Sequence, residues 1–141
     1  MATLTEIGRE LGREQRLKIE ERGYQLLFYI KALAWTPRAI RRYAVNADGK
    51  GVKGPGEIFA ELSAEDGMYD GFRVDRSGRI WTSTGKGVYC YEPDGTLIGK
   101  ILIPEIVANV TFGGPKRNRL FICGTTSLYS VLLMTNGSKL G

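Results

Sequence analysis

From residue 24 onward, hydrophobic and polar positions alternate in short runs, a pattern typical of β-strands. The runs are rich in β-branched and aromatic residues, and turn dipeptides separate them. Strands are predicted near 26–35, 38–45, 56–61, 71–75, 79–83, 86–91, 96–103, 109–112, 118–123 and 127–133. The tight-turn dipeptides are Asp48-Gly49, Ser77-Gly78, Asp94-Gly95 and Asn136-Gly137. This part of the chain is therefore predicted to be an all-β meander.

The first 23 residues have a helical pattern instead. Thr3 and Glu6 have the spacing of a capping box, in which each side chain satisfies a backbone donor at the helix start. Three apolar residues follow on one face: Leu4, Ile7 and Leu11. Gly23 is a C-terminal stop signal. We expect an α-helix over 3–22, and hence a helical appendage at 1–23 before a β domain at 24–141.

The predicted strands repeat along the chain. Residues 79–82 (Arg-Ile-Trp-Thr) correspond to 119–122 (Arg-Leu-Phe-Ile), and 87–89 correspond to 127–129, both at an offset of 40. Four strands in a period of ~40 residues match one blade of a β-propeller, although a β-sandwich with chance similarity is the alternative. The predicted fold class is all-β: a partial β-propeller of about two to three four-stranded blades, with the N-terminal helix.

The positive charge is concentrated in one segment. The formal net charge is +5, and the excess comes from 31–53. The basic residues of this segment are Lys31, Arg38, Arg41, Arg42, Lys50 and Lys53. A basic patch can bind nucleic acid, but it also protects the edge of a solvated hairpin from aggregation. We favour the hairpin and expect no nucleic-acid partner, because few aromatic residues are interleaved with these charges, with Tyr43 the one beside the arginines, and no nucleic-acid motif accompanies them.

Composition removes several kinds of chemistry. The 141 residues include no histidine, which excludes Ser-His-Asp and Cys-His nucleophiles and His-ligated zinc. The two cysteines, Cys90 and Cys123, form no C-x-x-C motif and suit two buried thiols in a reducing compartment.

No apolar stretch has membrane-spanning length and no signal peptide is recognisable, so we expect a cytoplasmic protein without a membrane partner. Gly49-x-Gly51-x-x-Gly54 resembles a dinucleotide fingerprint, but Pro55-Gly56 follows where a helix would have to begin.

Aspartates are the remaining candidates for site chemistry. Asp75 and Asp94 lie beside turn residues and are expected to form turns, while Asp66 lies in a polar loop. Asp70 directly precedes Gly71, at the entrance of a blade's innermost strand, where propeller loops line the axial opening. A carboxylate there can bind a hard cation, and without histidine Ca²⁺, Mg²⁺ or Mn²⁺ is favoured over zinc.

The segment from Asp70 to Trp81, D-G-F-R-V-D-R-S-G-R-I-W, resembles the P-D-G-x-x-x-D-x-x-G-x-x-W segment of the gluconolactonase and regucalcin (senescence-marker) family. The resemblance covers about residues 31–141 and is densest from 70 to 133. Its further segments are Gly87-Val88-Tyr89, Pro93-Asp94-Gly95, Gly99-Lys100-Ile101, Pro104-Glu105, the stretch from Asn109 to Pro115, Leu120-Phe121-Ile122 and Thr126 to Tyr129. Upstream, residues 40–43 with Asp48-Gly49 resemble an interior hairpin of the family.

The resemblance implies a six-bladed propeller with one divalent metal ion at its axis, which hydrolyses sugar lactones such as glucono-1,5-lactone. The cofactor implied is Ca²⁺, Mg²⁺ or Mn²⁺, with Zn²⁺ as a further option, and its role is to polarise the lactone carbonyl. Asp70 matches the family aspartate that is both a metal ligand and the general base. Tyr69 stands where the family has proline.

Two further family ligands have no counterpart in this sequence. An asparagine ligand aligns with Lys31, whose ammonium cannot bind a cation while it is charged, and a first-blade glutamate is expected to fall outside the sequence. Glu6 does not resemble it. The alternatives to a lactone hydrolase are therefore a non-catalytic propeller fragment and a protein-interaction module. Open blade edges also predict that the chain is a homo-oligomer or only marginally stable, which a monodisperse monomer with a high, cooperative melting transition would contradict.

Overall fold

The computed structural model describes residues 14–21, 24–30, 38–47 and 52–138. The chain forms two compact units, of which unit 1 ends at Glu61 and unit 2 begins at Leu62. Within these described ranges, no helix is both long and apolar enough to span a lipid bilayer.

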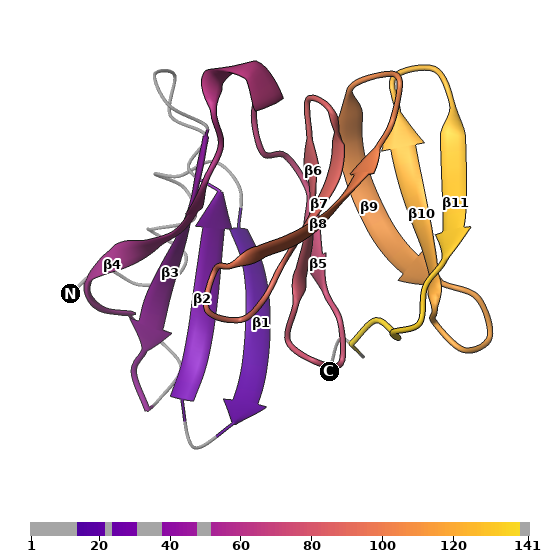
Figure 1. Ribbon diagram of the computed structural model, residues 1–141. Coiled ribbons are helices and arrows are strands. Elements are labelled where there is room, and N and C mark those ends of the chain that lie inside the picture. The colour runs from indigo at the N-terminus through magenta and orange to yellow at the C-terminus, as the bar shows by residue number, and fades with distance from the viewer. Residues whose placement is uncertain (1–13, 22–23, 31–37, 48–51, 139–141) are drawn as a thin grey trace. The chain divides into compact units, whose positions relative to one another are not determined.

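Unit 1 contains one four-stranded antiparallel sheet whose strands pair in sequence order (Figure 1). The strands are β1 (Glu14–Glu21), β2 (Tyr24–Ile30), β3 (Ala39–Val45) and β4 (Val52–Glu61). This order is that of a simple meander, in which each strand pairs with the strand before it in the chain. Four strands in one such meander match the expected content of one propeller blade.

The helix predicted over 3–22 is wrong for Glu14–Glu21, which form β1. The backbone of β1 pairs with β2 from Glu14↔Tyr29 to Leu17↔Leu26. Helix propensity is a weak local preference, and pairing with a neighbouring strand overrides it because the ladder satisfies the backbone donors and acceptors that face β2. Residues 3–13, with the predicted capping box, lie outside the described residues.

The basic segment coincides with β3 and β4, as expected for a hairpin. Arg42 Nε donates a hydrogen bond of 2.7 Å to Glu57 Oε1 on the paired strand, and the guanidinium lies 5.8 Å from the centroid of the Phe59 ring. Gly54 lies inside β4 rather than at a helix start, so the structure does not support the dinucleotide fingerprint. Lys31 and Lys50 lie outside the described residues.

Unit 2 contains a four-stranded and a three-stranded antiparallel sheet, again in sequence order. The first consists of β5 (Phe72–Val74), β6 (Ile80–Thr84), β7 (Gly87–Tyr91) and β8 (Leu97–Leu102), preceded by the short 3₁₀ helix η1 (Ala64–Asp66). The second consists of β9 (Val107–Gly113), β10 (Arg119–Gly124) and β11 (Leu128–Leu132). The sequence repeat at offset 40 is confirmed, because it relates β6 to β10 and β7 to β11, the second and third strands of each sheet.

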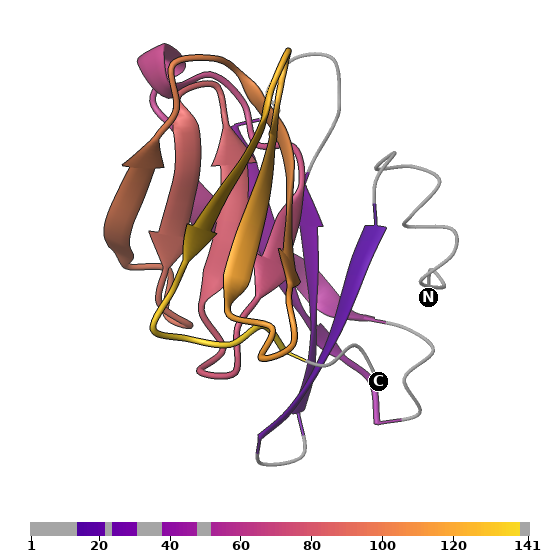
Figure 2. The same ribbon diagram turned by 90° about the vertical axis from the view of Figure 1, so that its right-hand side faces the viewer.

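The two sheets of unit 2 lie face to face, with β9–β11 in front in Figure 2. Six buried residues form the core between them: Val88, Val107, Val110, Phe112, Leu120 and Ile122. Trp81 packs on this cluster, and its ring meets Phe112 edge-on at 6.2 Å between centroids. Neither sheet could bury its apolar face alone, so stacking of consecutive sheets is what stabilises the unit.

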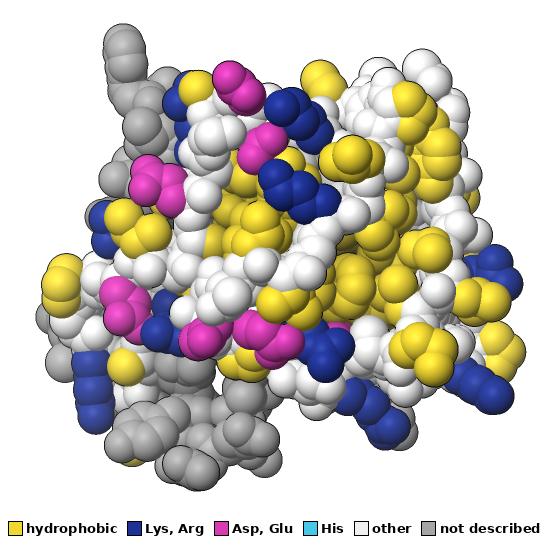
Figure 3. Space-filling view, in the orientation of Figure 1, with side chains coloured by type: hydrophobic (Ala, Val, Ile, Leu, Met, Phe, Trp, Pro, Cys, Tyr) yellow, Lys and Arg dark blue, Asp and Glu magenta, His cyan; other side chains and the backbone are white. Residues whose placement is uncertain are grey.

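The outer side of the second sheet remains apolar at its edge. Leu128 and Leu132 of β11 are 68% and 62% exposed, and Figure 3 shows hydrophobic side chains gathered over β8 to β11. Within the described residues, β11 pairs only with β10. Self-association through this edge stays a prediction.

The two cysteines differ in environment. Cys90 is buried, as expected, and burial raises the pKa of its thiol to about 12. Cys123 is exposed, so the prediction of a buried thiol is wrong there. The reason is the alternation of β10: Leu120 and Ile122 face the core, which leaves Cys123 on the outer face, paired with Asn109.

Candidate functional site

Several loops of unit 2 meet at one end of its two sheets, which we call the loop end. The register places the start of β5 beside the end of β6, because Phe72 pairs with Thr82. The β6–β7 turn and the end of β8 are at the same end, since Gly87 pairs with both Thr84 and Leu102. The start of β9 and the β10–β11 turn join them. Asp70, immediately before β5, therefore lies where the loops of consecutive sheets converge.

Asp70 is held through its two neighbours. Its backbone N–H donates to the carbonyl of Ser83 at 3.3 Å. Before it, Tyr69 is 3% exposed, and its hydroxyl lies 2.6 Å from the Tyr91 hydroxyl. After it, the Gly71 N–H donates to Ser83 Oγ at 2.7 Å. The backbone of Asp70 is thus fixed on both sides, while the residue itself is only half-buried.

The Tyr69–Tyr91 pair occupies the position where the resembling family has proline before the aspartate. Burial is the main cause that raises the pKa of the Tyr69 hydroxyl, and the hydrogen bond with Tyr91 adds to it. The same burial raises the pKa of Tyr91. Both hydroxyls are therefore neutral at physiological pH, and they anchor the chain before Asp70 by packing and hydrogen bonding.

Ser83 connects three strands at the loop end. Its Oγ lies 3.1 Å from the carbonyl oxygen of Gly71 and 3.2 Å from that of Ala108, so the hydroxyl joins β6 to the residues before β5 and to β9. Ser83 and its neighbours Thr82 and Thr84 are fully buried. The sequence analysis missed this polar group, although three successive hydroxyl residues inside a buried strand are an available signal, since buried hydroxyls require partners.

Asn109 lies against Gly71. A Cβ atom on Gly71 would overlap Asn109 Oδ1 and Cγ and come within 3.2 Å of Asn109 Cα, so any other residue at position 71 would displace the Asn109 side chain. Asn109 Oδ1 accepts a hydrogen bond of 2.8 Å from the Val110 N–H. Sequence reasoning did not identify Asn109 as a site residue; the available signal is an asparagine inside a strand, where this residue type is disfavoured.

Asp66 belongs to an ion-pair cluster. Its two carboxylate oxygens lie 3.3 Å from Lys86 Nζ and 3.5 Å from Lys100 Nζ. Lys100 Nζ also lies 4.3 Å from the centroid of the Tyr89 ring. A hydrogen bond from Tyr89 is the main cause that lowers the pKa of Asp66, and both lysines contribute. This carboxylate is already neutralised by two cations, so it is a poor ligand for a further cation.

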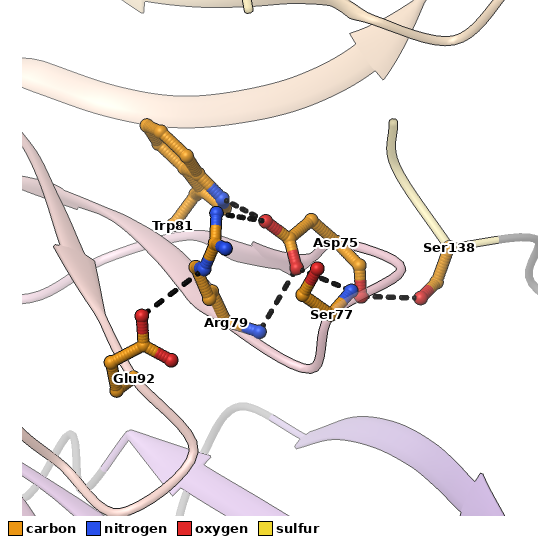
Figure 4. A network of polar contacts seen from close by, with 6 residues as sticks. All are labelled: Asp75, Ser77, Arg79, Trp81, Glu92 and Ser138. Atoms are coloured by element: carbon orange, nitrogen blue, oxygen red, sulfur yellow. Dashed lines mark hydrogen bonds and ion pairs between the residues drawn. The ribbon is translucent and has the colours of Figure 1, made fainter. Parts of the chain in front are cut away.

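Asp75 follows β5 and forms the β5–β6 turn, whereas Asp70 precedes that strand. Figure 4 shows the polar contacts of Asp75. Its side chain is fully buried, and Oδ1 accepts hydrogen bonds from the N–H groups of Ser77 and Arg79 at 2.9 and 3.0 Å. Oδ2 accepts one from Trp81 Nε1 at 3.1 Å. Asp94 similarly accepts the Thr96 N–H at 2.8 Å. The prediction that Asp75 and Asp94 form turns is confirmed.

Glu105 connects the β8–β9 link to the β10–β11 turn. Its Oε2 accepts hydrogen bonds from the Thr126 N–H at 2.6 Å and from Thr126 Oγ1 at 3.1 Å, and Oε1 accepts one from the Tyr129 hydroxyl at 2.5 Å. The Tyr129 hydrogen bond is the main cause that lowers the pKa of Glu105 to about 2. A shallow pocket of about 460 Å³ lies beside Glu105, lined by Gly85, Lys86 and residues 102–106. Asp70 does not line it.

The lowered pKa of Glu105 predicts acid sensitivity. A carboxyl whose folded pKa lies below its ordinary value of 4.5 stabilises the fold above that pH and loses this contribution as pH falls toward about 2. We expect Glu105→Gln to remove this part of the pH dependence and Tyr129→Phe to reduce it, measured as the midpoint of thermal unfolding between about pH 5 and pH 2. Equal slopes in wild type and Glu105→Gln would contradict the assignment.

The oxygen atoms at Asp70 are of the type that binds a hard cation. The Asp70 carboxylate offers oxygen, the ligand type that Ca²⁺, Mg²⁺ and Mn²⁺ prefer. No cluster of three or more His, Cys, Asp or Glu side chains suited to a metal ion occurs in the part of the chain that the structure describes. Lys31, aligned with a family ligand, lies outside it.

Consecutive antiparallel meander sheets with a carboxylate at their converging loops are typical of the propeller class of proteins. A sequence model of the SMP-30/Gluconolactonase/LRE-like region matches residues 27–126. The chain therefore belongs to this family, as the resemblance around Asp70 predicted.

Individual relatives agree with this assignment. A pentonolactonase of Haloferax volcanii is 36% identical over 88 residues, which cover 60% of this chain and 30% of the relative. The solved structure of a gluconolactonase from Xanthomonas campestris superposes with a TM-score of 0.66 at 34% identity, covering 77% of this chain and 34% of the other. The solved structure of a calcium-binding regucalcin from Agrobacterium tumefaciens is 20% identical and superposes with a TM-score of 0.66. The match covers 80% of this chain and 43% of the regucalcin chain, and at this identity it supports the fold alone. The chain spans less than half the length of each of these proteins.

Proposed function

We propose that the protein is a divalent-metal-dependent hydrolase of sugar lactones, or a part of such a hydrolase that contributes Asp70 to the active site. The observation that carries the proposal is the placement of Asp70, at the converging loops and fixed through both neighbours. The family to which the chain belongs, and the lactonases it is similar to, make a cyclic ester the expected substrate class.

In this proposal Asp70 has two roles. Its carboxylate is a ligand of a Ca²⁺, Mg²⁺, Mn²⁺ or Zn²⁺ ion, which when bound supplies Lewis-acid polarisation of the lactone carbonyl. The carboxylate also accepts a proton from the water that attacks the carbonyl carbon, and the ring C–O bond then breaks to give the hydroxy acid. Ser83, Gly71 and Tyr69 contribute by holding the backbone of Asp70 in place.

The test is hydrolysis of glucono-1,5-lactone by the purified chain after chelation, and again after addition of Ca²⁺, Mg²⁺, Mn²⁺ or Zn²⁺. We expect turnover above the uncatalysed rate only with metal present. A folded chain that shows no turnover with any of the four ions would contradict the proposal.

The second candidate function is a non-catalytic propeller fragment or interaction module. The exposed leucines of β11 favour it, because an apolar sheet edge is available for pairing with another chain. A chain that binds no metal, shows no turnover and self-associates would support this candidate over the hydrolase.

A further inference from the structure

Asn109 is a polar residue of β9 whose side-chain oxygen accepts a hydrogen bond from the Val110 N–H. It lies in β9 between two core residues, Val107 and Val110, and its own side chain is exposed. Asparagine is disfavoured in strands, because it packs poorly and competes for backbone hydrogen bonds. A residue that costs stability without contributing to the core is a candidate for binding.

The backbone brings Asn109 next to Asp70. Gly71, the residue after Asp70, is so close to Asn109 that a Cβ atom would overlap the side-chain amide. Ser83 Oγ fixes this approach, since it contacts the carbonyl oxygens of both Gly71 and Ala108. Asn109 of the second sheet thus lies against the residue that follows Asp70 at the loop end.

The orientation of the Asn109 amide follows from its hydrogen bond. The Val110 N–H is a donor, so the atom it contacts at 2.8 Å must be the oxygen Oδ1 rather than the nitrogen. Nδ2, with two N–H donors, is then the outer group. The described residues provide no hydrogen-bond acceptor for Nδ2. A pair of N–H donors is therefore available on a side chain that lies against Gly71, the residue that follows Asp70.

We infer that Asn109 is a substrate-binding residue, whose Nδ2 donates a hydrogen bond to a hydroxyl oxygen of the lactone bound at Asp70. The inference rests on the proposed lactone-hydrolase function and specifies its substrate class as hydroxylated lactones. A donor aimed at a ring hydroxyl favours a sugar lactone over an unsubstituted lactone, because only the sugar lactone has the matching acceptor.

The experiment compares kcat/KM for glucono-1,5-lactone and for δ-valerolactone, which has the same ring without hydroxyls, in the metal-loaded full chain. For Asn109→Ala, we expect the ratio of the two kcat/KM values to fall by about 2–10-fold, the worth of one neutral hydrogen bond. The fall comes from a higher KM for the sugar lactone, with δ-valerolactone unaffected. A second readout is the Kd of D-gluconate, the hydrolysis product, which we expect to rise by a similar factor.

Two further variants separate binding from folding. Asn109→Asp keeps the oxygen that accepts the Val110 N–H but has no Nδ2 donor, so it should lose the same preference even if Asn109→Ala is poorly folded. Thr111→Ala changes an exposed residue two positions along the same face of β9, and should leave the ratio unchanged.

An unchanged ratio in both Asn109 variants of an active enzyme would overturn the inference and leave the proposed function intact. An equal loss in Thr111→Ala would also overturn it, since the effect would then belong to the strand as a whole. Failure of wild type to hydrolyse either lactone with any metal would overturn the proposed function, and the inference with it.

Discussion

Asp70→Asn is expected to lower kcat/KM for glucono-1,5-lactone by about 10²–10⁴-fold, the usual contribution of a positioned general base. The substitution keeps the size of the side chain and removes its charge and its basicity. Binding of Mn²⁺ or Ca²⁺ should weaken by more than ~10-fold, because the loss of even an outer partner of a metal ligand costs about 10–100-fold. Calorimetric titration of the metal alone measures this without reference to turnover.

The matched control for this prediction is Asp94→Asn, which makes the same charge change in a turn at the opposite end of the sheet. Asp94 accepts the Thr96 N–H through Oδ1, and asparagine retains such an oxygen. We therefore expect wild-type metal affinity and turnover. If Asp70→Asn binds metal and turns over like Asp94→Asn, Asp70 is neither ligand nor base.

Asp75→Ala is expected to destabilise the fold by about 3–5 kcal/mol without touching the loop end. It leaves three donors without their acceptor, the N–H groups of Ser77 and Arg79 and the Trp81 indole. The Arg79 guanidinium, 3.7 Å from the carboxylate, keeps its second ion pair with Glu92 at 3.2 Å, which moderates the loss. Urea unfolding at neutral pH measures the change in the free energy of unfolding.

Two comparisons identify the cause of that loss. Asp75→Asn retains one acceptor oxygen, so it should cost about 1–3 kcal/mol, less than the alanine variant. Asp94→Ala removes the hydrogen bond from the Thr96 N–H in an exposed turn and should cost about 1 kcal/mol. If Asp75→Ala and Asp94→Ala were equally mild, the buried network would contribute little to stability.

The strands after residue 38 were predictable because their signals are local. Alternation of apolar and polar residues marked β6 and β10, and the offset of 40 showed that the two occupy the same place in successive sheets. Turn formation by Asp75 and Asp94 was also predictable from the sequence, because an aspartate accepts hydrogen bonds from the N–H groups that follow it in the chain.

The first strand and the exposed thiol were not predictable in this way. The sequence over Glu14–Glu21 has a helical pattern, yet its backbone pairs with β2, and a ladder with another strand leaves no local signature. Cysteine is a residue type that is usually buried. Cys123 is exposed because it lies on the outer face of β10.

By itself, the sequence determined the meander of strands, the repeat of sheets, the family and the selection of Asp70 as the candidate carboxylate. Only the tertiary structure decided what surrounds Asp70. Its surroundings are the Tyr69–Tyr91 hydroxyl pair, the hydrogen bond from Ser83 Oγ to the Ala108 carbonyl and the approach of Asn109 to Gly71. The physical reason is sequence separation. Periodicity and turn chemistry act between residues a few positions apart, whereas these contacts join residues 12 to 38 positions apart, which meet only when strands pair and consecutive sheets stack.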